Sequence, residues 1–489
     1  MTPRARAVHW AHAASEPCDT SESNPGHPHI GYSGANPGGG TVPTPKSLPG
    51  APNCLYNPQQ LAQDGRRALS YGLREVSRLL LAPYPEFAGA LTCGVPMRHI
   101  PGDDVEVALY HDPEGGHRVG FHGLMTCSSP WVCPVCSPKL AAQRGEALAR
   151  ALAHFHAAGL WVAHAVLTVQ HTRGEALADV FGALADAWRR MTKSREFRPH
   201  WSGLGYARGV EVTLGPNGWH PHIHLAVVIP PDRDPYALEE ALWEAWSGAV
   251  KAIGWDECDR EAFHYELCKT PADAQQVGRY VSKAGSGWGL GPEVAGGARK
   301  QARGGMSPFQ LLGVAWAGYL EDPEGMASWF PQAGEDFSLG GLGQGGGLII
   351  REFCRAASER ANRLGVTPQG AAWRWLEYAE ATKARKALTS SRALGLVLKA
   401  KLAEVEAEAQ NAVPIEVIWL SRRVYIYLLR TAQLARLVHL AEALGSLRRA
   451  CEMLGLVEGD EYTLPPANAP PLSPEGEGER VLSPVQGAG

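Results

Sequence analysis

Hydrophobic and polar positions follow two different periods through the middle of the chain. Apolar residues recur at intervals of three and four over one segment, which predicts a helix: Leu177, Val180, Phe181, Leu184, Trp188 and Met191. Strands are predicted over 161–169, 209–214 and 222–229, the last two on either side of a Pro-Asn-Gly turn. Further helices are predicted over 58–83 and 236–253. The pattern therefore predicts an α+β fold.

Composition divides the chain into six segments. Residues 1–57 and 461–489 are rich in Pro and Gly and too poor in apolar side chains to offset the entropy of ordering, so we expect them to be disordered. Between them lie a helix with a cysteine-bearing segment (58–150), mixed strands and helices (151–300), a Gly-rich connecting region (301–350) and a helical region (351–460). Aromatic residues among Lys and Arg in the helical region fit either DNA contact or a solvated amphipathic helix.

Charge and targeting signals narrow the class of protein. The net charge of -4 and the pI near 6.5 exclude a basic nucleic-acid coat protein, so DNA binding needs local patches. Residues 139–208 hold ten Lys and Arg against five Asp and Glu, and residues 279–303 hold five against one. The chain lacks the apolar core of a signal peptide and any apolar run of roughly 18 residues, so we expect a cytoplasmic protein with no membrane partner.

A His-Pro-His-Ile-His segment gives the sharpest chemical signal. His222 and His224 lie two apart on a predicted strand, so both side chains point to one face and can hold one divalent metal. Alternatively, they form only a polar strand face. His220 precedes the proline, and we expect it to lie behind the two ligands or to contact DNA.

Glu211 on the preceding strand is the third candidate ligand. A turn at 217–218 pairs it with His224, and a turn at 216–217 pairs it with His222. Either turn puts Glu211 on the histidine face, and the first pairing leaves its carboxylate within reach of the same ion. Two His and one carboxylate leave open positions on the metal for a substrate phosphate.

A tyrosine supplies the second chemical element. Thr270, Pro271 and Asp273 form a good helix start, and the helix carries Tyr280 with Lys283 three residues later on the same face. An unaided tyrosine hydroxyl is a poor nucleophile, but a nearby lysine and a metal-polarised phosphate would help it attack. The alternative is a helix tyrosine that packs on the core.

A cysteine cluster predicts a structural zinc site. Cys127, Cys133 and Cys136 form C-x5-C-x2-C, in which two thiolates two residues apart can reach one tetrahedral ion. Cys93 is the best fourth ligand, and His122 is the reserve. A redox Cys-x-x-Cys pair is the alternative, but the third cysteine nearby favours zinc.

Together these motifs resemble the rolling-circle replication initiators of the His-hydrophobe-His (HUH) endonuclease superfamily, and the plasmid Rep family in particular. The resemblance rests on GWHPHIHL at 218–225 followed by VGRYVSKA at 277–284. LTVQH (167–171), the cysteine segment (127–144), SPFQLL (307–312) and RKALTSSRAL (385–394) match other family blocks. The histidines precede the tyrosine in this chain, and this order is similar to that of Rep proteins, whereas conjugative relaxases have the opposite order.

The resemblance implies a fold and a reaction. The fold is a central antiparallel sheet of about five strands flanked by helices. His222, His224 and Glu211 would hold Mg2+ or Mn2+, and Tyr280 would nick one strand of plasmid origin DNA. The products would be a 5′-phosphotyrosine link and a 3′-hydroxyl primer, with Lys283 steadying the charge. A host helicase and a host DNA polymerase are the implied partners, because no phosphate-binding loop of a helicase is present.

One departure and two rival functions complete the sequence-based picture. Many family members carry a water-activating glutamate one turn before the tyrosine, where this chain has Gln276; Asp273, two turns back, is a weaker substitute. A single-strand transposase of the same superfamily would share the site but act on transposon ends. A zinc-bearing DNA-binding regulator would need no catalysis and would tolerate loss of the Tyr280 hydroxyl.

Overall fold

The structure is a computed structural model, and it describes residues 58–97, 104–112, 115–256, 259–282, 305–330, 347–430 and 433–464. The chain divides into two compact units, Met1–Leu55 and Tyr56–Gly489, and the description below concerns the second. The expected disordered segment 1–57, most of the expected tail and Lys283 lie outside the described residues. The six-segment division of the chain remains a prediction.

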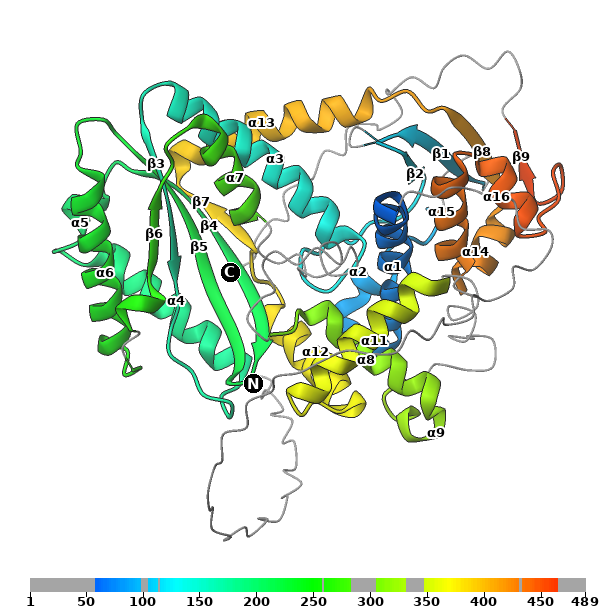
Figure 1. The fold of residues 1–489 in the computed structure, drawn as a ribbon, viewed down its shortest axis with the longest axis horizontal. Coiled ribbons are helices and arrows are strands. Elements are labelled where there is room, and N and C mark those ends of the chain that lie inside the picture. Colours follow the sequence, from blue (N-terminus) through cyan, green and yellow to red (C-terminus); the bar gives the residue numbers. More distant parts are fainter. Residues whose placement is uncertain are drawn as a thin grey trace, which may run out of the picture. The chain divides into compact units, whose positions relative to one another are not determined.

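A five-stranded antiparallel sheet forms one half of the described unit (Figure 1). Its strand order is β6-β3-β5-β4-β7, and every neighbouring pair is antiparallel. The strands are β3 (Trp161–Leu167), β4 (Gly205–Gly215), β5 (Gly218–Ile229), β6 (His264–Leu267) and β7 (Leu388–Ser390). The expected α+β fold, with antiparallel strands flanked by helices, is confirmed.

Helices cover both faces of this sheet. On one face α4 (Leu177–Lys193) and α6 (Pro235–Ala252) pack on Ile223, Leu225 and Val227 of β5. On the other face α3 (Cys136–Ala157), α7 (Pro271–Ser282) and α13 (Arg392–Gln410) pack on Ala226 and Val228. This alternation follows from the two-residue period of a strand, and each fully buried Leu or Ile side chain contributes about 1.5–3 kcal/mol.

A second sheet combines segments from both ends of the described chain. Its order is β2-β1-β8-β9, built from β1 (Val105–His111), β2 (His117–Phe121), β8 (Glu416–Leu420) and β9 (Tyr462–Thr463). It lies with α1 (Pro58–Leu81), α14 (Arg422–Arg430), α15 (Gln433–Leu444) and α16 (Leu447–Met453). The region 351–460, expected to be helical, therefore also contains β7 and β8, because these short strands complete sheets begun elsewhere.

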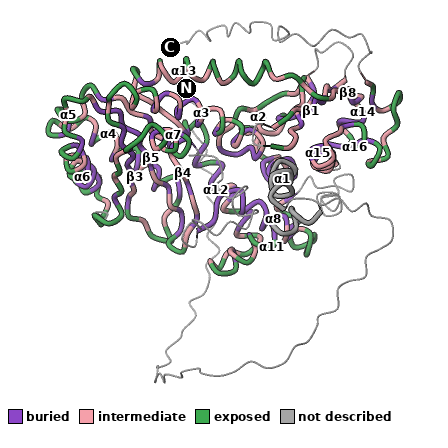
Figure 2. The backbone as a smooth tube through the Cα atoms, turned by 45° about the horizontal axis from the view of Figure 1, so that its top comes forward, coloured by how far each residue is buried: buried purple, intermediate pink, exposed green. Residues whose placement is uncertain are grey.

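The remaining helices are α2 (Ala88–Leu91), α5 (Arg198–Trp201), α8 (Pro308–Glu321), α9 (Pro323–Met326), α11 (Gly347–Arg363) and α12 (Pro368–Thr382), with 3-10 turns at Pro85–Phe87 and Arg260–Ala262. Of these, α8 packs against α11 and α12, whereas α5 packs against α4. Ser307 and Gln310 form a capping box at the start of α8. Figure 2 shows β3 and β5 largely buried and α13 exposed along much of its length. Among the described helices, none is both long and apolar enough to cross a membrane.

Candidate functional site

The β4–β5 hairpin positions the predicted metal ligands. Gly215 pairs with Gly218, so Pro216 and Asn217 form the turn and Glu211 lies opposite His222. The other register, in which Glu211 would pair with His224, is wrong. A glycine suits position 218 because its φ is 90° and an added Cβ would lie 3.0 Å from the Cα of Arg173.

The Glu211 carboxylate nevertheless reaches both histidines. Its Oε2 lies 3.1 Å from His222 Nε2 and 2.8 Å from His224 Nε2. The ligand atoms of the three residues all lie within 4.8 Å of one another. We expected the Glu211 carboxylate to reach the ion if Glu211 paired with His224. Although it pairs with His222, its side chain is long enough to reach both imidazoles on that face.

The donor chemistry of this trio fits a cation. His222 Nδ1 lies 3.4 Å from the His220 carbonyl oxygen, and donation there leaves Nε2 as an acceptor that faces a carboxylate acceptor. Burial raises the pKa of the Glu211 carboxyl, but its close contacts with His222 and His224 outweigh burial and hold that pKa well below its ordinary value. Burial also lowers the pKa of His224. A carboxylate beside two imidazoles is a set that binds a divalent metal.

Tyr280 lies directly against this trio. It projects from α7, and its ring centroid is 4.7 Å from that of His224 at an interplanar angle of 81°. Its side chain is 37% exposed, so a substrate can approach it. Burial, with a smaller contribution from the Glu211 charge, raises the pKa of the phenol, so the hydroxyl keeps its proton at neutral pH in the metal-free protein.

The two accessory residues on α7 have different surroundings. The Asp273 carboxylate accepts hydrogen bonds from the backbone N–H of Lys269 (3.0 Å) and of Thr270 (2.9 Å), so it caps the start of the helix. The hydrogen bond with the Thr270 side chain, followed by these backbone bonds, lowers the pKa of Asp273. Gln276 is exposed one turn before Tyr280.

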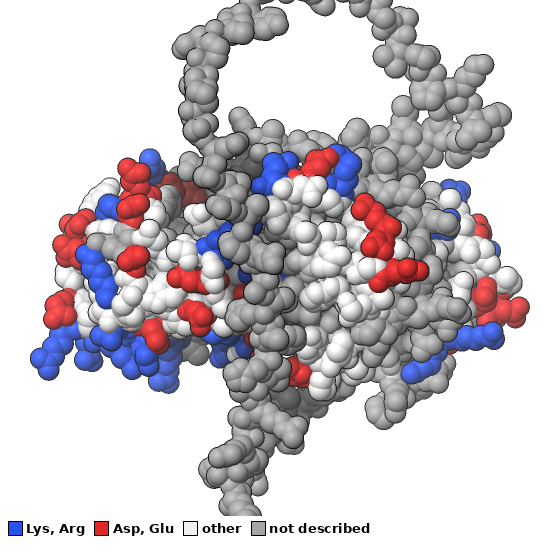
Figure 3. All heavy atoms as spheres, turned by 90° about the horizontal axis from the view of Figure 1, so that it is seen from below, with Lys and Arg blue, Asp and Glu red and all other residues white. Residues whose placement is uncertain are grey.

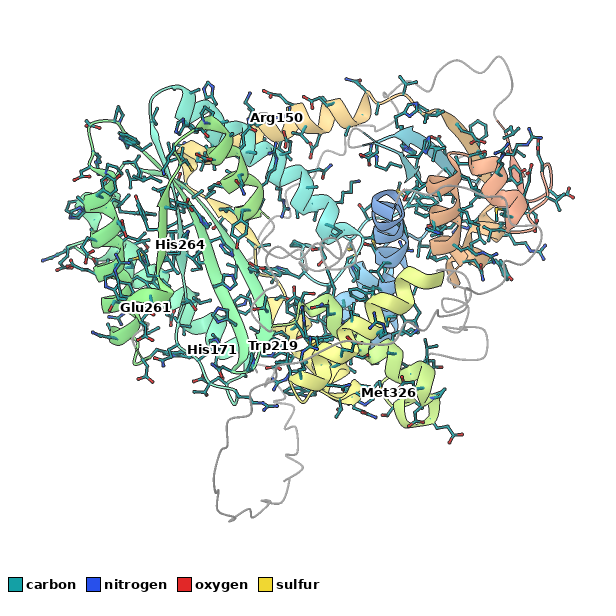
Figure 4. The ribbon with its side chains drawn as sticks, in the orientation of Figure 1. Arg150, His171, Trp219, Glu261, His264 and Met326 are labelled. Atoms are coloured by element: carbon teal, nitrogen blue, oxygen red, sulfur yellow. The ribbon has the colours of Figure 1, made fainter. Side chains whose placement is uncertain are left out.

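Two further histidines extend the cluster beside the hairpin turn. His220 Nδ1 lies 2.7 Å from His171 Nε2, and His171 Nδ1 lies 3.1 Å from the Asn217 carbonyl oxygen. Burial lowers the pKa of His220 to about 3. His171 and Trp219 lie at the turn end of the hairpin in Figure 4, and His264 lies on the edge strand. His220 therefore lies beside His222, with ring centroids 5.1 Å apart, and its role remains a prediction.

His164 of β3 is a site residue that the sequence reasoning missed. It is 7% exposed, its ring stacks on that of His224 (5.6 Å, 15°), and its edge meets Tyr280 (5.4 Å, 84°). Its Nε2 has no hydrogen-bond partner among the described residues. The available signal was a histidine inside the apolar strand WVAHAVL, in a sheet that carries other histidines.

The four predicted zinc ligands come together. The Sγ atoms of Cys93, Cys127, Cys133 and Cys136 all lie within 4.8 Å of one another. Backbone N–H groups point at two of them, from Cys136 to the Cys133 sulfur and from Ser129 to the Cys127 sulfur. The reserve ligand, His122, instead contacts the Tyr110 hydroxyl at 2.9 Å.

Part of the chain matches the model of a known protein family. Residues 120–251, which include Glu211, His222, His224 and three of the four clustered cysteines, match the model of a family described as "Replication protein". No solved structure matches the chain.

Two curated relatives come from Streptomyces. A "Protein rep" of Streptomyces lividans is 27% identical over 244 residues, covering 39% of this chain and 53% of the relative. A "Neomycin resistance protein" of Streptomyces cyanogenus is 31% identical over 135 residues, covering 22% of this chain and 31% of the relative. The match thus spans about half of the first relative and a third of the second. The family match over residues 120–251 and the relative named "Protein rep" confirm the resemblance to plasmid replication initiators drawn from the motifs.

Proposed function

We propose that this protein initiates rolling-circle replication of a plasmid as an HUH-type nuclease that nicks one strand of the origin. The observation that carries the proposal is the contact between Tyr280 and His224, one member of a trio suited to a divalent metal. A nucleophile beside a metal that can bind phosphate is the arrangement that strand transfer needs. A DNA-binding regulator without catalysis leaves this juxtaposition without a purpose.

The chain's own groups divide the work of the reaction. Glu211, His222 and His224 would hold Mg2+ or Mn2+, which when bound polarises the scissile phosphate. The Tyr280 hydroxyl attacks phosphorus, forms the phosphotyrosine ester on the 5′ side and loses its proton, while the bond to the 3′-oxygen breaks and that oxygen gains a proton. Lys283 steadies the negative charge in this scheme; its position lies outside the described residues.

The cysteine cluster has a structural role in this proposal. Four sulfur ligands leave no open position for a substrate, which is typical of a structural zinc site. Cys133 and Cys136 lie at the start of α3, the helix that packs on α7 and its tyrosine. Zinc there would hold the start of α3 in place.

Origin DNA is the proposed partner, with a host helicase and a host polymerase downstream. Exposed basic side chains follow one another at the end of α4 and through α5: Arg189, Arg190, Lys193, Arg195 and Arg198. Figure 3 shows Lys and Arg gathered at the end of the molecule that holds the five-stranded sheet. Such a group suits contact with DNA phosphates.

The test is covalent capture of the cut strand. The protein is incubated with Mn2+ and a labelled single-stranded origin oligonucleotide, then run on a denaturing gel. Wild type should give a protein–DNA band that Tyr280→Phe lacks. Tyr236→Phe is the matched control, because Tyr236 is 69% exposed on α6, across the sheet from the site, and should form the band normally.

Two outcomes would contradict the proposal. A band from Tyr280→Phe would assign the nucleophile elsewhere. Absence of a band from wild type with every origin strand, with Mn2+ or with Mg2+, would favour a zinc-bearing DNA-binding regulator.

A further inference from the structure

Two imidazole rings, rather than one, face the Tyr280 phenol. His224 lies 4.7 Å from the phenol centroid at 81°, and His164 lies 5.4 Å from it at 84°. The two imidazoles are nearly parallel to each other, at 15° and 5.6 Å. The phenol is therefore perpendicular to a pair of stacked rings.

The strands explain why His164 can support this arrangement. Val166 pairs with His224 and His164 pairs with Ala226, so His164 and His224 lie on the same face of neighbouring strands. β3 is hydrogen-bonded to β5 on one side and to β6 on the other. His164 thus projects from an inner strand that pairing fixes on both sides.

Metal binding does not account for His164. The ligand trio contains Glu211, His222 and His224 only, and the His164 Nε2 has no hydrogen-bond partner within the described ranges. A buried polar nitrogen without a partner is unfavourable, so an apolar residue would be the ordinary choice at this strand position. The feature of His164 that meets the site is its flat ring.

We propose that His164 is a positioning residue whose ring, together with that of His224, forms the seat for the Tyr280 phenol. The inference rests on the proposed role of Tyr280 as the nucleophile. Edge-to-face contacts hold aromatic rings at a defined angle. Tyr280 lies in the last turn of α7, which ends at Ser282, and two ring faces at right angles to the phenol restrict its rotation there. A reacting atom misplaced by about 1 Å can slow a reaction about 100-fold.

The test compares three replacements of His164 in the full chain. His164→Phe keeps a flat ring and removes both nitrogens, His164→Leu keeps apolar volume without a ring, and His164→Ala removes both. The measurements are the rate of covalent adduct formation at saturating oligonucleotide, the half-saturating oligonucleotide concentration and the affinity for Mn2+. Circular dichroism melts show whether each variant is folded.

The ring-seat role predicts a split between rate and binding. The adduct rate should fall roughly 10- to 100-fold in the Leu and Ala variants, and Phe should restore it to within about threefold of wild type. Oligonucleotide and Mn2+ binding should stay within about threefold in all three. The control His111→Ala removes an exposed imidazole from β1 in the other sheet and should leave the rate unchanged.

The failures of the two proposals can be told apart. If wild type forms the adduct and Phe is as slow as Ala, a nitrogen of His164 matters and the ring seat is wrong. If Leu and Ala react as fast as wild type, His164 has no positioning role. If wild type forms no adduct, the nucleophile assignment and this inference are both overturned.

Discussion

At the scale of single residues, the site is a group of buried polar side chains that stabilise one another only in part. Two imidazoles contact the Glu211 carboxylate, whereas His224 Nδ1 and His164 Nε2 have no hydrogen-bond partner among the described residues. Such groups lower the stability of the folded chain by about 1–3 kcal/mol each. The arrangement is therefore costly for folding, as expected of residues kept for chemistry.

One consequence is a pH dependence of stability. Burial lowers the pKa of His164 from 6.5 to about 3. Between these values the unfolded chain binds a proton on this residue that the folded protein does not bind, so stability falls as the pH drops through that window and is unaffected above it. The slope is at most about 1.4 kcal/mol per pH unit. The melting temperature of His164→Phe should therefore decrease less between pH 7 and pH 5 than that of wild type, measured without added Mg2+ or Mn2+. Equal decreases would contradict a lowered pKa of His164.

Residue-level chemistry was predictable where a local pattern determines it. The two-residue period of a strand put His222, His224 and Glu211 on one face, and the Cys-x-x-Cys spacing with Cys93 predicted the group of four cysteines. The register was not determined, because both two-residue turns satisfy that period. His164 was not found, because a single histidine in an apolar strand becomes a site residue only through its neighbours on another strand.

At the scale of elements, the crossing of α3 and α7 determines where the tyrosine lies. An added Cβ on Gly278 of α7 would lie 2.4 Å from the backbone nitrogen of Ala149 on α3. Beside this close contact, Arg279 pairs with Glu146 at 3.1 Å. Tyr280 follows two residues after the glycine, so the distance between the helices sets its reach.

Gly278→Ala should therefore displace Tyr280. Overpacking at the crossing should lower the free energy of unfolding by about 1–3 kcal/mol and slow adduct formation by roughly 10-fold or more. Gly248→Ala on α6 is the control, because its added Cβ meets nothing within 4 Å and should be neutral or stabilise by about 0.5–1 kcal/mol. Thermal melts and the adduct assay measure both effects, and an unaffected adduct rate in Gly278→Ala would show that the crossing does not position Tyr280.

The long, strongly periodic elements were the predictable ones. The expected helices at 58–83, 177–191 and 236–253 correspond to α1, α4 and α6. The short strands β7 and β8 were missed, because three to five residues in a helix-rich region carry little periodic signal and acquire their structure from partners far away in sequence.

At the scale of the whole molecule, late segments complete both sheets. β7 pairs with β4 at the edge of the five-stranded sheet, and β8 pairs with β1 in the second sheet. In β1, Val105, Val107 and Leu109 are at most 1% exposed. The region beyond α13 is therefore part of the fold that carries the cysteine segment.

Truncation tests this dependence. A chain that ends at Asn411 lacks β8, α14–α16 and β9, which leaves the apolar side of β1 and α1 uncovered. We expect this chain to show no cooperative melting transition and to aggregate. A chain that ends at Leu464 keeps every described element and should melt like the full chain. A soluble, cooperatively melting 1–411 fragment would show that the two regions fold independently.

Because β1 pairs with β8, the second sheet cannot be completed until late in translation. Leu109 of β1 pairs with Glu416 of β8, 307 residues further along the chain. A ribosome that adds about 5–20 residues per second needs roughly 15–61 s to cover that interval. Throughout it, the β1–β2 hairpin has an unpaired edge and lacks its packing against α15 and α16, and an unpaired edge is the condition under which strands of different nascent chains join. A cell that makes this protein must shield one half-built sheet for most of the time spent on translation.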